Sequence, residues 1–328
     1  MRGWRALGLF WSAVIVSGAA SIAALQIVGP PGSVESAAAL ASVPQAAAVT
    51  EQRHAPQAAE PSVKQASSVT PTPVTSKSAP PAPDIREQAP FRAFARATDP
   101  TDKRPKLALL VIGVGLSESD SRLAIDTLPP AVTMGVSPYA YEPEVVTAAA
   151  RARGHEYVVT LPMESQGYPL NDSGPRALLS GAEPADNTRN LEWVLSRIDG
   201  AVGVTGASDG LRGERFASAP HLIGPVLETL DKKGLMYIDP RPDAVVSGTA
   251  VAVTTILDDP PVRASVQNRL AELEQRARDG KPALGLAGPL RPAIVEQIAN
   301  WARGLDGRGV DLVPVSSLVS ATARLENH

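Results

Sequence analysis

Short apolar runs alternate with amphipathic stretches from residue 106 onward. Runs of branched residues bounded by turn residues are typical of buried strands, and apolar positions recurring every three or four residues indicate helices. The pattern predicts strands at residues 107–112, 131–136, 156–161, 201–204, 235–239, 250–256, 283–286 and 310–313. It predicts helices at 118–127, 142–153, 184–198, 217–233, 260–279 and 291–305.

This repeated order of strand and helix predicts an α/β domain built on a parallel sheet. Seven or eight strands fall within residues 106–322 and leave few long connections, which favours a distorted (β/α) barrel over an open doubly wound sheet. Residues 323–328 form a short tail after this domain.

The amino terminus predicts a membrane segment. Residues 6–28 are uncharged and mostly apolar, and a helix of that length would span about 35 Å, enough to cross the hydrocarbon core. Arg2 and Arg5 before it predict an inner-membrane anchor, single-pass, with the rest of the chain in the periplasm. A cleaved signal peptide is the alternative, because Ser21-Ile22-Ala23 has the small-residue spacing of a cleavage site.

Residues 29–105 are dominated by Ala, Pro, Ser, Val, Thr and Gln. A segment so poor in aromatic residues cannot bury enough apolar surface to fold, so we expect a disordered linker between the anchor and the domain.

The overall composition excludes several classes of function. The 328 residues carry a formal net charge of −3 and no cysteine. A near-balanced charge leaves no electrostatic footprint for nucleic acid, and the absence of cysteine excludes disulfides and thiolate metal sites.

The turn after the first strand, Gly113-Val114-Gly115, raises the hypothesis of a nucleotide-binding protein. The third position of the dinucleotide fingerprint is Glu118, and the second strand ends at 136–138, "VSP", where an acid should meet the ribose. A tight strand-to-helix turn is the simpler interpretation of the two glycines.

Several segments together resemble the divergent polysaccharide deacetylases of bacterial envelopes, within the NodB-homology superfamily. They are "GHEYVVTLPMES" (154–165), "GYPLNDSGPRALLSG" (167–181), "NLEWVLSRIDGAVGV" (190–204), "GLMYIDPRP" (234–242) and "LVPVSSL" (312–318). The resemblance covers residues 106–322 and implies a distorted barrel of parallel strands and a glycan or another envelope component as partner.

The chain departs from this family at the positions that imply a metal. Where family members end the first strand with paired aspartates, this chain has Ile112 and Gly113. Thr160 replaces a histidine, "TGASDGLRGERF" (205–216) replaces an Asn-Asn-His-Met-Gly element, and "AGP" (287–289) replaces Gly-His-Pro. Deacetylation of this type needs a divalent metal held by Asp and His, so we expect neither a bound metal nor another cofactor.

Polar residues nevertheless follow several strands. The candidate catalytic carboxylates are Glu164, Asp239 and Asp258, and the candidate substrate-binding residues are Thr160, Glu164, Tyr168, Asn171, Asp172, Asp209 and Arg241. Tyr139, Tyr141 and Tyr168 could offer flat faces to a sugar ring.

Each of these polar groups also has a structural interpretation. Glu164 could accept backbone N–H bonds, and residues 171–175 have the chemistry of a capped turn. Arg241 could hold an anionic group or form a salt bridge with Asp239 or Asp258. Residues 258–261, "DDPP", are typical of a helix start.

The leading hypothesis is an envelope-facing, metal-free and catalytically degenerate deacetylase-like protein that binds glycan or an envelope partner. The alternative is an active carbohydrate hydrolase, a deacetylase or glycosidase, that works through carboxylates such as Glu164, Asp239 and Asp258.

Overall fold

The structure is a computed structural model that describes residues 90–319. The predicted anchor at 6–28, most of the predicted linker and the tail at 323–328 lie outside the described residues. Within 90–319, none of the helices has the length and apolar character needed to cross a bilayer.

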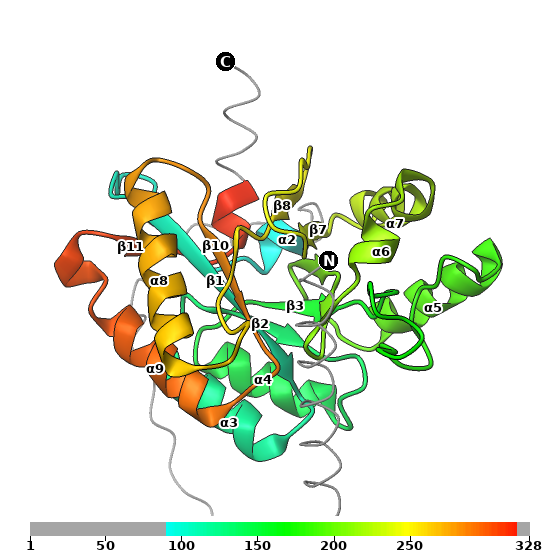
Figure 1. The fold of residues 1–328 in the computed structure, drawn as a ribbon, viewed down its shortest axis with the longest axis horizontal. Helices are drawn as coiled ribbons and strands as arrows, with labels where there is room; N and C mark the ends of the chain where they lie inside the picture. The colour runs from blue at the N-terminus through cyan, green and yellow to red at the C-terminus, as the bar shows by residue number, and fades with distance from the viewer. Residues whose placement is uncertain (1–89, 320–328) are drawn as a thin grey trace, which may run out of the picture. The chain divides into compact units, whose positions relative to one another are not determined.

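A parallel sheet forms the centre of the fold (Figure 1). Its strands follow the spatial order β8-β7-β4-β3-β2-β1-β10-β9, and β11 pairs with the beginning of β1. Their bounds are β1 (Lys106–Val114), β2 (Thr133–Val136), β3 (Tyr157–Thr160), β4 (Gly203–Thr205), β7 (Met236–Asp239), β8 (Ala250–Ala252), β9 (Thr255–Ile256), β10 (Leu284–Ala287) and β11 (Asp311–Leu312).

The two ends of this strand path meet in one segment of chain. β8 pairs with β7 and β9 pairs with β10, although only Val253 and Thr254 separate them. The Val253 N–H donates to Asp239 O at 2.9 Å, and the Thr254 N–H donates to Leu284 O at 2.9 Å. The predicted strand at 250–256 therefore exists, but it divides its hydrogen bonds between two neighbours and curves the sheet into a barrel-like shape.

Helices cover the outside of the sheet. They are α2 (Pro90–Ala93), α3 (Glu118–Thr127), α4 (Pro143–Ala152), α5 (Pro184–Ser196), α6 (Glu214–Ala217), α7 (Pro220–Lys232), α8 (Arg263–Arg278) and α9 (Pro292–Arg303), with a 3₁₀ turn, η1, at Asp306–Arg308. In Figure 1, α3, α8 and α9 gather on one side of the sheet, and α5, α6 and α7 lie on the other.

The apolar run of β1 is continuous because this strand is buried on both faces. Its alternate residues Leu107, Leu109 and Val111 belong to one large apolar cluster, which also contains the buried faces of the helices. Ala108, Leu110 and Ile112 belong to a second cluster, formed largely by residues of the strands. The period of two along the strand thus separates a core outside the sheet from one inside it.

The folded region begins before residue 106. Phe91 is buried, and its N–H donates to Gly234 O at 3.1 Å. The Arg96 N–H donates to a carboxylate oxygen of Glu156 at 3.3 Å. The linker boundary predicted at 105 is therefore too late, because a single aromatic residue and a few backbone bonds fix residues 90–105 to the domain.

The predicted helix at 260–279 begins later than its composition indicates. Helix α8 starts at Arg263 with Val262 at its N-cap, and no side chain caps it. The interpretation of 258–261 as a helix start is wrong, because Asp258 turns toward residues that follow β10.

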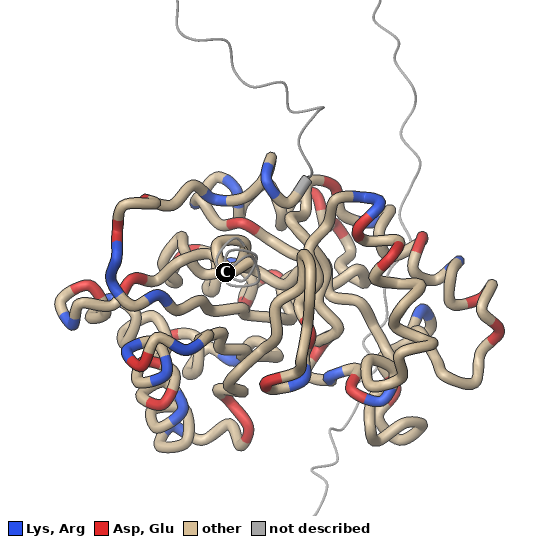
Figure 2. Tube along the Cα trace, turned by 90° about the horizontal axis from the view of Figure 1, so that it is seen from above, with Lys and Arg blue, Asp and Glu red and all other residues tan. Residues whose placement is uncertain are grey.

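Charged residues of both signs are interspersed along the outer helices and loops, whereas the stretches that cross the middle of the domain are mostly uncharged (Figure 2). This distribution along the described residues agrees with the near-balanced net charge of the whole sequence.

Candidate functional site

A cleft of about 330 Å³ opens where β1, β9 and β10 end. In barrels of parallel strands, the loops that follow the strands form the ligand sites. Ile112, Leu211, Ile256, Leu286 and Pro289 contribute apolar surface to this cleft. Its polar lining comes from Ser165, Gln166, Asn171, Arg212, Glu214, Asp258, Asp259 and Arg291.

The carboxyl end of β1 is apolar and tightly packed. Ile112 is only 2% exposed. Gly113 has a φ of 93°, and a Cβ there would lie 3.2 Å from the backbone nitrogen of Leu290. A Cβ on Gly288 would lie 2.4 Å from Ile112 Cγ1. These glycines let the turn after β10 pack directly on β1, which explains the glycine turn without any bound phosphate.

A hairpin absent from the sequence prediction lies beside this turn. It consists of β5 (Ala207–Ser208) and β6 (Leu211–Arg212), which pair antiparallel. Its two turn residues, Asp209 and Gly210, have φ values of 52° and 87°, the backbone that a two-residue hairpin turn requires. A Cβ on Gly210 would lie 2.6 Å from Pro289 Cδ, so the hairpin tip packs against the turn after β10.

Asp209 is partly buried and does not line the cleft, although Gly210 and Leu211 beside it do. One carboxylate oxygen accepts a long bond of 3.5 Å from the Ser137 hydroxyl, and the other is buried with no hydrogen-bond partner among the described residues. Burial raises the pKa of Asp209, and hydrogen bonds from Ser208 and Ser137 oppose that rise. The Ser208 hydroxyl lies 3.4 Å from Thr160 Oγ1, and Thr160 is fully buried.

Asp258 is a buried carboxylate on the wall of the cleft. It accepts bonds from the Gly288 N–H at 3.1 Å and from Arg291 Nη1 at 3.0 Å. Burial raises the pKa of Asp258, although the Gly288 N–H and the Arg291 charge act in the opposite direction. This pair joins the chain after β9 to the start of α9.

A second ion-pair group stands at the same cleft. Arg212 Nε donates to Glu214 at 2.7 Å, and Arg212 Nη1 lies 3.5 Å from an Asp259 oxygen. Since each arginine of the cleft faces an acid of the cleft, the lining offers many hydrogen-bonding groups with little net charge. Such a surface suits a polar, uncharged ligand.

Glu164 is buried and makes the contacts expected of a structural carboxylate. It is 3% exposed; one carboxylate oxygen accepts the Ser180 N–H at 2.5 Å, and the other lies 2.9 Å from Arg215 Nε. Both oxygens are engaged within the chain, and Glu164 does not line the cleft.

The remaining candidates are distributed around the loops. Arg241 forms the internal salt bridge with Asp239, with Nη2 and a carboxylate oxygen 2.6 Å apart. Asp172 accepts the Gly174 N–H at 2.9 Å, as in a capped turn. Neither group nor Tyr168 lines the cleft. Of all the predicted site residues, Asn171 and Asp258 are the two that the cleft brings together.

The residues present do not fit the metal that the family resemblance implies. Ile112, Gly113, Thr160 and Gly288 carry no carboxylate or imidazole at the implied positions. From residue 90 to 319, no group of three or more His, Cys, Asp or Glu side chains is placed to hold a metal ion. A site for zinc or a similar ion needs such donors.

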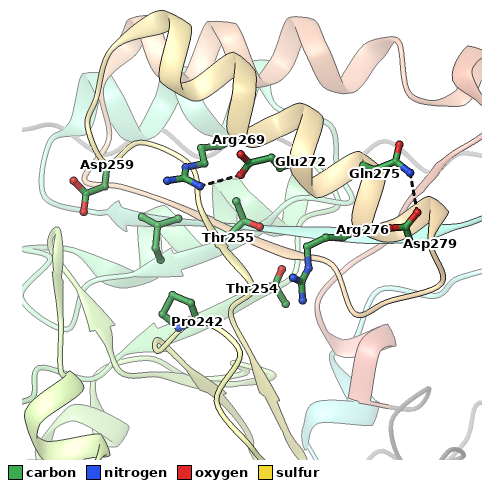
Figure 3. A pocket seen from close by; sticks show the side chains of 10 residues that line it. Pro242, Thr254, Thr255, Asp259, Arg269, Glu272, Gln275, Arg276 and Asp279 are labelled. Atoms are coloured by element: carbon green, nitrogen blue, oxygen red, sulfur yellow. Dashed lines mark hydrogen bonds and ion pairs between the residues drawn. The ribbon is translucent and has the colours of Figure 1, made fainter.

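A larger hollow of about 590 Å³ runs beside α8 and shares Ile256 and Asp259 with the lining of the cleft (Figure 3). Along the helix, Arg269 bonds to Glu272 and Gln275 bonds to Asp279, while Pro242, Thr254 and Thr255 lie opposite. Arg276, which also lines it, is paired with Asp243 at 2.6 Å. This hollow lies along a helix, whereas the cleft lies where strands of the sheet end, which is where barrels of parallel strands bind their ligands, so we place the candidate site at the cleft.

Sequence reasoning missed the residues that complete the cleft. The sequence pattern indicated Arg291 only as the first residue of a predicted helix. Gln166 follows the "LPMES" segment, and no motif marks it as a binding residue. A usable signal was the position of Arg291, just after the Gly288-Pro289 turn that ends β10. Asp258 and Arg291 are far apart in sequence, so only the fold shows that they pair.

The parallel strands and outer helices define an α/β fold with a ligand cleft at the carboxyl ends of its strands. The sequence model of the family described as divergent polysaccharide deacetylase matches residues 109–319. The chain belongs to this family, as the sequence resemblance predicted.

Comparison with solved structures finds a crystal structure of an uncharacterized protein from Agrobacterium tumefaciens C58. It matches with a TM-score of 0.64 and 30% identity, over 70% of this chain and 94% of that one. The catalytic domain of peptidoglycan N-acetylglucosamine deacetylase from Eubacterium rectale ATCC 33656 matches with a TM-score of 0.42 and 15% identity, over 67% of this chain and 92% of that one. A comparison with curated proteins finds no match.

Proposed function

We propose that this protein is a catalytically degenerate member of its family that binds glycan in the cleft at the ends of β1, β9 and β10. The observation that carries the proposal is the apolar end of β1, where Ile112 is buried and Gly113 has no side chain. Without acid or imidazole, this strand end offers no group to hold a metal that would polarise an amide carbonyl.

The lining of the cleft supports a glycan as the ligand. Gln166 and Asn171 are exposed amide side chains that can both donate and accept hydrogen bonds, as sugar hydroxyls require. The arginines of the cleft are engaged by acids, which disfavours a strongly charged ligand. Family membership gives the same ligand class, because the family takes its description from polysaccharides.

We further propose that residues 6–28 anchor the chain in the inner membrane and that the domain faces the periplasm. The support is the uncharged stretch that follows Arg2 and Arg5. Protease added to spheroplasts should degrade the domain, and protection of the domain would contradict the orientation. A mature chain beginning near Ala24 would show instead that the segment is a cleaved signal peptide.

Calorimetric titration of the full-length protein with N-acetylglucosamine oligomers and soluble peptidoglycan fragments tests the glycan proposal. We expect saturable binding without release of acetate. Gln166→Ala and Asn171→Ala should each weaken binding by about tenfold, the effect of losing one or two hydrogen bonds. Gln275→Ala is the matched control, because Gln275 is an exposed glutamine in the other hollow, beside α8.

Two results would overturn the proposal. Release of acetate, abolished by Asp258→Asn, would favour the active hydrolase. Binding that is weakened by Gln275→Ala and unchanged in the two cleft variants would move the ligand to the hollow beside α8.

A further inference from the structure

Three large apolar side chains are exposed where β1 and β2 lead into α3 and α4. Tyr141 is 92% exposed, Val145 is 61% exposed and Leu116 is 49% exposed. Exposed apolar groups that gather in one place on a soluble domain often mark an interaction site, whereas scattered ones need no explanation.

Close packing of the two loops brings the chain at Leu116 near the chain at Tyr141, and Val145 follows Tyr141 in the first turn of α4. A Cβ on Gly115 would lie 2.6 Å from the Ala140 Cβ, and Ala140 is itself buried. The Ser137 N–H donates to Val114 O at 2.9 Å, which ties the loops together at their bases. Leu116 follows Gly115 directly and Tyr141 follows Ala140 directly, so both emerge from the point of contact.

Acidic side chains surround these apolar residues. Glu118 and Asp120 lie in the first turn of α3, Glu142 is the N-cap residue of α4 and Glu144 lies in its first turn. None of the four forms an ion pair within residues 90–319. Arg122 is the basic residue between 115 and 150, so the surface is acidic on balance.

Exposed apolar side chains next to unpaired carboxylates restrict the kind of partner that can bind this surface. Unpaired carboxylates repel an anionic lipid surface and attract Lys and Arg. Apolar side chains gain from being removed from water. The complementary partner therefore carries apolar side chains flanked by basic ones.

We infer that Leu116, Tyr141 and Val145, with the acidic residues around them, form a docking surface for a partner protein whose contacting segment is apolar and basic. The surface comprises the β1–α3 and β2–α4 loops and the first turns of α3 and α4, and none of these residues lines the cleft. The inference therefore stands apart from the glycan proposal.

The test uses full-length protein and a fluorescein-labelled amphipathic peptide of leucine and lysine, with binding followed by anisotropy. We expect the triple variant Leu116→Ser, Tyr141→Ser, Val145→Ser to bind at least about tenfold more weakly, because central apolar anchors carry most of the binding energy in protein interfaces. The variant Glu118→Gln, Glu142→Gln, Glu144→Gln should weaken binding and flatten its dependence on salt.

Matched controls separate this surface from general stickiness. Val245 is a fully exposed valine on the β7–β8 loop, so Val245→Ser should leave peptide binding unchanged. A leucine–glutamate peptide should not bind. Absence of binding by the leucine–lysine peptide, or equal binding to wild type and the triple variant, would overturn the inference. Tyr141→Ser weakening N-acetylglucosamine oligomer binding, with no effect on the peptide, would also overturn it by assigning this surface to glycan.

Discussion

Two acidic side chains, the buried Glu156 and the partly buried Asp209, have opposite surroundings at the two ends of the sheet. Glu156 precedes β3 and accepts bonds from the Thr133 hydroxyl at 2.9 Å, the Ser316 hydroxyl at 2.5 Å and the Ser316 N–H at 3.1 Å. Asp209 lies beyond the carboxyl ends of the strands, and one of its oxygens is buried without a partner among the described residues.

The hydrogen bonds of Glu156 stabilise the fold at one end of the sheet. Stability alone does not explain the unpaired oxygen of Asp209 at the other end. The Glu156 network joins the amino-terminal segment, two strands and the carboxyl-terminal segment, so every bond it makes holds the fold together. At the opposite end, one oxygen of the Asp209 carboxyl group has no partner among the described residues, beside a cleft with two ion-pair groups. Buried polar atoms without a partner are uncommon, and they are expected where function rather than packing decides the residue.

The largest loss of stability should come from removing the Glu156 carboxylate and its hydrogen bonds. Glu156→Ala leaves the Thr133 and Ser316 groups buried without their acceptor, and we expect a loss of roughly 3 kcal/mol in the free energy of unfolding. Urea unfolding followed by circular dichroism measures it. Glu192→Ala, which removes an exposed carboxylate on α5, should change the value by less than about 0.5 kcal/mol. Equal effects of the two substitutions would contradict the contrast drawn between the ends.

A smaller effect is expected at the wall of the cleft. Arg291→Ala removes a charge that opposes the rise in the pKa of Asp258, so that pKa should rise further. We expect a loss of about 1–2 kcal/mol near neutral pH, modest because Arg291 is partly exposed. The loss should disappear in acid, where Asp258 is neutral in both proteins. Urea unfolding across a pH series tests this, and Arg291→Lys should recover part of the stability.

The smallest effect is expected for Asp209→Asn, which should raise the free energy of unfolding. Burial raises the pKa of Asp209, so the folded protein holds this proton more tightly than the unfolded chain. The stability that results is complete below the ordinary carboxyl pKa and is lost as the pH rises to the folded-state pKa. Asp209→Asn stays neutral, and we expect it to exceed wild type by about 1 kcal/mol near neutral pH.

The Asp209 prediction has a clear control. The advantage of Asp209→Asn should shrink toward acid pH, whereas Asp172→Asn, at an exposed aspartate of a neighbouring loop, should run parallel to wild type. A constant difference between Asp209→Asn and wild type at every pH would show that the carboxyl group does not titrate as proposed.

Most elements of the fold could be predicted from the sequence. The helix at 118–127 matches α3 at both ends, and each predicted strand overlaps an observed one. Apolar periodicity is a local property, and Pro at the first turn of α4, α5, α7 and α9 gives a local start signal. The hairpin at 207–212 escaped prediction because strands of two residues have too few positions to show alternation.

The site was less predictable than the fold. Residue types alone placed Asp258 at a helix start, and the structure gives it Gly288 and Arg291 as partners. The same types left two roles open for Glu164, and the structure adds its contacts with Ser180 and Arg215, which agree with the structural role. Hydrogen-bond partners that are distant in the chain have no local signal, so composition leaves them undetermined.

The sequence by itself determined that residues 109–319 belong to the divergent polysaccharide deacetylase family and alternate between strands and helices, and that Ile112 and Gly113 stand where the family resemblance implies acids. Tertiary structure decided which polar groups meet in the cleft, how 250–256 divides between β7 and β10, and that residues 90–105 belong to the folded domain. The physical reason is the distance along the chain over which each interaction acts. Periodicity and turn chemistry act between neighbours in the chain, whereas burial, ion pairing and strand closure depend on segments that only folding brings into contact.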